Sequence, residues 1–175
     1  MKKIFFTLLL GTLLSQSSVA GSKASVDDVI KSSFTGVSTI EPKQIILTQK
    51  QFSQVQSRAK AAVRTKIYRY YDIQSKHGRL GYAVLIARKV RAKKATVLYA
   101  FDNTGKLKFT EIMAFGEPPE YIPNTTWMSQ LQNQSASTKL TVGKDIPTIS
   151  GSTLSARSIT EGARVARAIY EIVLK

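Results

Sequence analysis

A short segment near the C-terminus, residues 150–155 with the sequence SGSTLS, has residue types that suit binding of a phosphate group. Four of its six side chains carry hydroxyl groups, and Gly151 lets the backbone approach a ligand closely. The segment precedes a stretch with helical periodicity, and the first N–H groups of a helix are unpaired and partly positive. These features predict a phosphate cradle; a plain N-cap on a turn is the alternative that the residue types leave open.

Arg157 extends this pattern because it follows Thr153 by four residues. If Thr153 opens the helix, the two side chains share one helix face. The guanidinium is then placed to pair with a bound phosphate.

Residues 116–121, GEPPEY, form a second segment of interest. Its two prolines lack backbone donors and fix φ, so we expect a loop. Glu117 and Glu120 resemble a pair of acid–base carboxylates, but the sequence shows no nucleophile to accompany them. We therefore favour solubility or ligand positioning over hydrolysis, and we assign no catalytic residue.

Composition removes most metal centres. The chain has 175 residues, no Cys and a single His, which excludes disulfides, thiolate zinc sites, cysteine-ligated iron–sulfur clusters and multi-histidine metal sites. The one histidine, His77, lies in a basic turn where we expect it to be solvated. We predict no metal ligands.

The elements that must position these segments follow from periodicity. Apolar spacing predicts a helix over residues 49–63 with Thr48 as its N-cap, and a final helix from about residue 156 onward whose arginines lie on the surface. The short apolar run at residues 45–47 suits a strand, and alternating apolar and aromatic residues predict four more, over residues 66–73, 80–90, 94–101 and 106–115. Residues 80–90 are apolar on both alternating sets, so we place them centrally in the sheet.

Three finer expectations concern the start of the chain and the last strand. Residues 21–39 are small, polar and weakly patterned, which predicts a partly ordered start. A turn is expected over residues 102–105. In the strand that follows, we expect Leu107 and Phe109 to share one face, with a bulge near Glu111.

Strands flanked by helices predict an α+β domain. We expect a twisted, mainly antiparallel sheet, with one helix before it and a C-terminal helix after residues 150–155. Residues 21–79 form the N-terminal part of this domain, and residues 80–175 form its core. A short helix capped by Asn124 or Thr125 carries Trp127, for which core packing and ligand stacking both remain open.

Residues 150–155 resemble the Ser/Thr-Gly-Ala-Thr segment of the bacterial FMN-binding domain family. That family includes the C subunit of the sodium-pumping NADH:quinone reductase and the G subunit of the Rnf complex. The likeness extends to the hairpin at residues 99–106, the Glu-Pro loop at 115–121 and the helix at 156–168. It covers about residues 81–171, roughly half of the chain.

The resemblance implies FMN esterified through its phosphate to Thr153 by a flavin transferase that uses FAD and magnesium; noncovalent FMN is the other option. Thr153 matches the last Thr of the family motif. The remaining residues expected at the FMN site are Ser150, Gly151, Ser152, Leu154, Ser155 and Arg157, with Glu117, Pro118 and Tyr121 as weaker flavin contacts.

Two positions depart from the family pattern. Ser152 replaces the usual Ala and places a second hydroxyl beside Thr153, where it can impair recognition by the transferase or act as a second acceptor. Pro147 stands where relatives often carry Asp.

Residues 1–20 have the three parts of a secretory signal: Lys2-Lys3, an apolar run, and small residues ending at Ala20. We predict export, to the periplasm in a Gram-negative bacterium. The formal net charge of +15 then favours docking to acidic redox partners or peripheral contact with an anionic membrane. Because exported proteins meet little nucleic acid, we expect no nucleic-acid partner.

The sequence therefore predicts an exported flavoprotein that transfers electrons between periplasmic or membrane redox partners, rather than a stand-alone enzyme. The alternative is a non-redox binding module whose basic surface docks an acidic partner or an anionic membrane. A noncovalent flavin reductase is a third reading.

Overall fold

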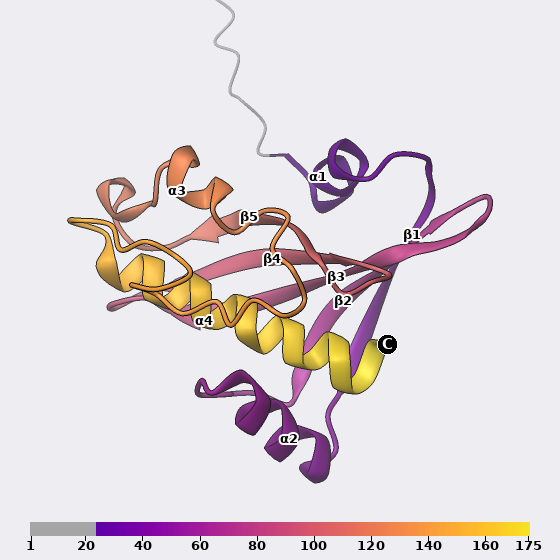
Figure 1. The fold of residues 1–175 in the computed structure, drawn as a ribbon, viewed down its shortest axis with the longest axis horizontal. Helices are drawn as coiled ribbons and strands as arrows, with labels where there is room; N and C mark the ends of the chain where they lie inside the picture. Colours follow the sequence, from indigo (N-terminus) through magenta and orange to yellow (C-terminus); the bar gives the residue numbers. More distant parts are fainter. Residues whose placement is uncertain (1–23) are drawn as a thin grey trace, which may run out of the picture.

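The computed structural model describes residues 24–175, which form a five-stranded antiparallel sheet with helices on its faces (Figure 1). The strands lie in chain order, β1 Val37–Ile46, β2 Ile67–Ser75, β3 Gly78–Lys89, β4 Lys94–Asp102 and β5 Leu107–Phe115. The helices are α1 Val26–Ser33, α2 Gln49–Ala59, α3 Thr125–Ser129 and α4 Thr153–Ile169, with single turns at Pro119–Tyr121 and Tyr170–Leu174. The predicted α+β class is confirmed. The predicted signal, residues 1–20, lies outside the described residues.

The sheet carries a separate apolar core on each face. One face packs against α4, the yellow helix crossing the sheet in Figure 1, and buries large side chains such as Tyr99, Phe101 and Ile159. Helix α2 packs against α4 and adds side chains to the same core. The other face packs against α1 and buries Ile30 and Phe109, among others. β3 lies in the middle of the sheet, as its two apolar sets predict. Because the middle of α4 is buried in this core, the positions of both ends of the helix are fixed.

A glycine lets α4 come unusually close to the sheet. A Cβ built on Gly162 would lie 2.3 Å from the hydroxyl oxygen of Tyr99. That hydroxyl donates a 2.7 Å hydrogen bond to the carbonyl of Ile159, and burial raises the pKa of Tyr99. The middle of α4 is therefore fixed to β4 by a close contact and a buried hydrogen bond.

The start of the chain is more ordered than its weak pattern predicts. Ser25 and Asp28 form a capping box, in which each side chain bonds the other residue's backbone N–H, and α1 follows directly. Phe34 packs edge-on against Phe109 at 6.1 Å between ring centroids. The expectation of a partly ordered start is wrong over residues 26–39, because local capping and long-range packing act together.

The last strand also differs from its prediction. The register between β4 and β5 shifts twice, leaving Lys108 and Met113 as extra residues. The first bulge puts Leu107 in the α4-side core and Phe109 in the α1-side core, so these two side chains do not share a face. A single extra residue reverses the alternation of a strand, and no local pattern marks where it falls.

Other boundaries agree closely with expectation. Thr48 caps α2 with a capping box, but the helix ends at Ala59 because Lys60 adopts a left-handed conformation. The turn over residues 102–105 is present, with φ of 87° at Gly105. No helix within residues 24–175 has the length and apolar character needed to cross a membrane.

Candidate functional site

The N-terminus of α4 is open where a cap would normally close it. Ser152 occupies the N-cap position, but its side chain makes no hydrogen bond to the helix end. Its hydroxyl instead donates a weak 3.4 Å bond to the carbonyl of Glu120. The partly positive end of this 17-residue helix is therefore left without a side-chain cap, as an anion site requires.

Gly151 bends the chain into this helix. Its φ of 77° is in the left-handed region, and a Cβ built there would meet no atom within 4 Å. The conformation requires glycine for backbone reasons, and the open space leaves room for a ligand beside the helix start.

A depression of about 200 Å³ lies over this helix start. Residues 151–155 form its floor, and Arg91 and Tyr121 form its wall. The guanidinium carbon of Arg91 lies 4.7 Å from the centroid of the Tyr121 ring, a cation–π contact. The β3–β4 connection and the turn at Pro119–Tyr121 thus meet the predicted phosphate segment.

Thr153 is exposed at the first position of α4. Its hydroxyl donates a 2.9 Å hydrogen bond to the carbonyl of Ile149. Leu154 beside it is 44% exposed, and Ile122, adjacent to Tyr121 in the chain, is 43% exposed. The acceptor predicted for the phosphate is accessible, and apolar surface for a ring system lies next to it.

Glu117 positions the wall of the depression and does not line it. One carboxylate oxygen accepts the backbone N–H groups of residues 91, 92 and 93, at 2.8, 2.7 and 2.7 Å. These backbone hydrogen bonds, of which the one from Lys93 has the largest effect, hold the pKa of Glu117 below its usual range. Direct contact between Glu117 and a flavin stays a prediction, while the geometry gives this side chain a positioning role for Arg91.

Three other predicted residues lie outside the depression. Ser150 and Pro118 are exposed but do not line it. Arg157 lines two neighbouring hollows, each of about 200 Å³ or less, and shares one of them with Leu154. The cation that the structure places over the helix start is Arg91.

Arg91 was missed as a site residue because it belongs to a basic run, residues 88–94, which is typical of a solvated turn. The signal that links it to the site is the carboxylate of Glu117, and it becomes visible only when the loop folds back on the β3–β4 connection. Trp127 belongs to the core: it is 5% exposed, and its indole N–H donates a 2.8 Å bond to the carbonyl of Pro147, which secures the segment before the site.

The described part of the chain has no candidate metal centre. Residues 24–175 contain no group of three or more His, Asp or Glu side chains placed to hold an ion. His77 is exposed in the turn before β3, as expected.

The comparisons with known proteins add no assignment: no protein-family model matches this chain, and no curated protein is significantly similar to it.

Three structural features at α4's N-terminus suit a phosphate group. The helix start has no side-chain cap, Thr153 is exposed, and Arg91 with Tyr121 provides charge and an aromatic face beside it.

Proposed function

We propose that this protein is an exported flavoprotein that carries FMN on Thr153 through a phosphoester and transfers electrons between periplasmic or membrane redox partners. The observation that carries the proposal is the exposed Thr153 at a helix start without a side-chain cap, in a depression that Arg91 also lines. Bound FMN supplies reversible uptake of one or two electrons.

The residues of the chain have separate tasks in this proposal. The first N–H groups of α4 hold the phosphate, and Arg91 balances its remaining negative charge. Tyr121 and Leu154 provide surface for the ring system. Glu117 fixes the β3–β4 connection and so keeps Arg91 in place.

Attachment is a group transfer without redox change. The Thr153 oxygen forms a bond to the FMN phosphorus of FAD, the pyrophosphate bond of FAD breaks, and AMP leaves. The hydroxyl proton passes to the transferase or to solvent. Because the ester oxygen carries no hydrogen, the bond from Thr153 to the Ile149 carbonyl is lost, so the side chain must rotate on loading.

The test is expression of the full chain in an exporting host with a flavin transferase, riboflavin and magnesium. We expect flavin absorbance that survives denaturation and one FMN in the intact mass. Thr153→Ala should lose the label, whereas the matched variant Ser152→Ala should keep it. If neither the wild type nor Ser152→Ala acquires flavin, the proposal fails; if the flavin is released by denaturant, the noncovalent reading holds instead.

An exposed basic cluster favours the second candidate, a non-redox binding module. Lys89, Arg91, Lys93 and Lys94 are exposed at the β3–β4 connection, and none of them takes part in an ion pair among residues 24–175. Such a cluster suits an acidic docking partner. This candidate requires strongly salt-dependent binding to an acidic protein by flavin-free chain; binding that appears only after flavin loading excludes it.

A further inference from the structure

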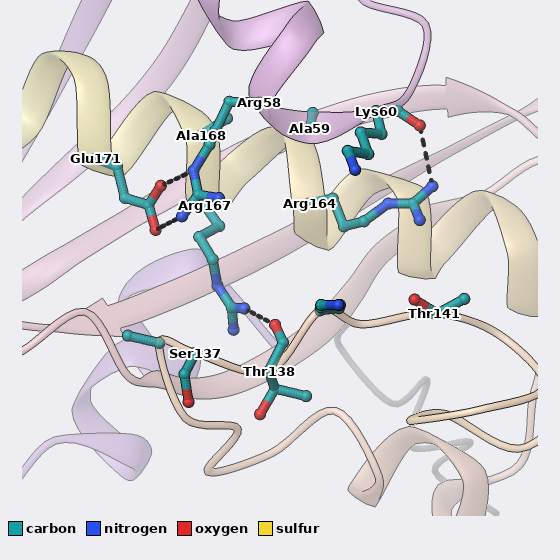
Figure 2. Close-up of a pocket in the computed structure, with 12 residues that line it drawn as sticks. Arg58, Ala59, Lys60, Ser137, Thr138, Thr141, Arg164, Arg167, Ala168 and Glu171 are labelled. Atoms are coloured by element: carbon teal, nitrogen blue, oxygen red, sulfur yellow. Dashed lines mark hydrogen bonds and ion pairs between the residues drawn. The ribbon is translucent and has the colours of Figure 1, made fainter.

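Another cavity, of about 270 Å³, lies near the opposite end of α4 (Figure 2). Its walls are the C-terminal end of α2, the second half of α4 and the loop at residues 136–141. Arg167 in its wall follows Thr153 by fourteen residues, which is about 21 Å along a helix. The cavity is therefore separate from the site proposed for FMN.

The charges around this cavity do not balance. Its lining includes one carboxylate, Glu171, and five cationic side chains, namely Arg58, Lys60, Lys139, Arg164 and Arg167. Arg58 donates two hydrogen bonds to that carboxylate, of 2.6 and 3.2 Å. Four positive charges in the lining thus have no ion-pair partner within residues 24–175.

Arg167 is the most unusual of the four because it is buried. The sequence predicts it on the surface, but it is 7% exposed, which corrects that expectation. One terminal nitrogen donates to the carbonyl of Thr138, as Figure 2 shows, while Nε and the other terminal nitrogen are buried without a partner. Burial lowers the pKa of Arg167, partly offset by Glu171.

A buried guanidinium in this state is costly. Arginine keeps its charge in proteins, so burial leaves a desolvated cation whose donors are only partly satisfied. Such a group is stabilised by an anion that accepts its remaining hydrogen bonds.

Arg164 reinforces the positive character of the same cavity. It donates a 3.4 Å bond to the carbonyl of Lys60, the left-handed residue that ends α2, and its own Nε is buried without a partner. The carbonyl end of a helix is partly negative and would repel an anion, so this contact offsets the unfavourable end of α2. The side chains of Lys60 and Lys139 are exposed in the lining.

We infer that this cavity binds a small molecule bearing a multiply charged oxyanion, either a phosphate or a pair of carboxylates. Arg167 is the buried anchor, Arg164 its neighbour on α4, and Lys60 and Lys139 supply the rim. The volume admits a small molecule, and the excess of positive charge requires more than one negative charge for balance. The inference does not depend on flavin at Thr153.

Calorimetric titration of the full chain with pyrophosphate and with citrate, at constant ionic strength and with chloride as the reference anion, tests this site. We expect saturable binding with one site per chain and a rise in melting temperature. Arg167→Lys keeps the charge but loses the planar fork, and should weaken binding about tenfold, as expected for loss of a charge-assisted hydrogen bond. Arg164→Gln, which leaves the buried residue intact, should also weaken binding.

Controls separate this site from general attraction to a basic protein. Lys76→Gln removes an exposed charge in the β2–β3 turn and should leave binding unchanged. Thr153→Ala should bind both anions like the wild type, which makes failure here distinguishable from failure of the flavin proposal. Absence of saturable binding, or equal binding by wild type, Arg167→Lys and Arg164→Gln, overturns the inference.

Vesicles containing phosphatidic acid, a phosphomonoester that can carry two negative charges, identify the source of the phosphate. Binding that pyrophosphate displaces and that Arg167→Lys weakens assigns the cavity to a lipid headgroup. Vesicle binding that is independent of Arg167, with soluble anions still bound through it, assigns the cavity to a soluble ligand.

Discussion

The two ends of α4 both lie among positive charge, but of different physical origin. At the N-terminus the positive potential comes from backbone N–H groups, with Arg91 as an exposed addition. Near the C-terminus the backbone is partly negative, and cationic side chains, one of them buried, reverse its sign. The difference lies in cost: the first site follows from helix geometry, whereas the second requires desolvation of Arg167.

This contrast indicates what each end is suited to do. An exposed helix start that carries a threonine can receive a large group that remains partly in solvent. A partly enclosed cavity with a buried guanidinium selects for charge and size. The two sites share one rigid connection, the middle of α4, where Gly162 meets Tyr99.

The largest effect should follow from breaking that connection. Gly162→Ala places a Cβ against the Tyr99 hydroxyl and displaces it from the Ile159 carbonyl. Alanine favours a helix by about 1 kcal/mol over glycine, but overpacking and the lost buried hydrogen bond outweigh this, so we expect a net loss of about 2 kcal/mol. Urea unfolding measures the difference.

A double variant tests the cause. Tyr99→Phe combined with Gly162→Ala removes the hydroxyl that clashes and should recover part of the loss. Gly151→Ala, at a left-handed position with open space around it, should cost about 1 kcal/mol through backbone strain alone. Equal losses in Gly162→Ala and Gly151→Ala would show that the close contact does not limit the approach of α4.

The next effect concerns the buried charge. Without added phosphate or carboxylate, Arg167→Met should leave the free energy of unfolding unchanged or raise it by about 1 kcal/mol, since an apolar side chain of similar length avoids the desolvation cost. Saturating pyrophosphate should reverse the order by stabilising only the wild type. Thermal melts of both proteins in the two buffers provide the measurement.

The opposite result would also be informative. If Arg167→Met lowered the free energy of unfolding by several kcal/mol without an anion, the bond to Thr138 alone would compensate for burial of the arginine. The C-terminal end of α4 would then be a structural contact, and the comparison between the two ends would fail.

Acid should weaken the N-terminal site through Glu117. The pKa of Glu117 is lower in the folded than in the unfolded state, so the unfolded state binds more protons and stability decreases as the pH falls. The contribution is complete above the unfolded value near pH 4 and is lost as the pH falls through the lower folded value. Melting temperatures between pH 6 and 2 should decline less steeply in Glu117→Gln, which cannot titrate; parallel curves would contradict the assigned role.

The sequence predicts the parts of this protein whose signals are local. Apolar spacing locates α2, α4 and strands β2 to β5, and Thr48 and Asn124 mark helix starts through their side-chain oxygens. The hydroxyl-rich segment, residues 150–155, lies at the start of α4, which begins at Thr153 rather than near residue 156. These predictions succeed because neighbouring residues carry the information.

Long-range pairing explains what the sequence does not reveal. The bulge at Lys108 becomes apparent only when β5 pairs with β4, and Arg91 reaches the site only because Glu117, far along the chain, binds its backbone. Arg167 interrupts no pattern in α4, yet the loop at residues 136–141 covers it. Helix α1 differs from these cases, because the weak residue pattern does not predict it although the Ser25–Asp28 capping box is a local signal.

Replacing Arg91 should have the smallest effect on stability but a clear effect on flavin loading. The variant therefore separates the contact of Arg91 with Tyr121 from its proposed role beside the phosphate. Arg91→Gln removes an exposed cation–π contact worth about 0.5 kcal/mol, so unfolding should change little. Flavin incorporation should nevertheless slow, because the phosphate loses its nearest cationic side chain at the helix start. The matched variant Arg69→Gln removes an exposed arginine on β2 and should load at the wild-type rate. Mass spectrometry over a time course compares the three proteins. Equal rates would mean that the backbone of α4 alone holds the phosphate, which would sharpen the contrast with the side-chain site at the other end.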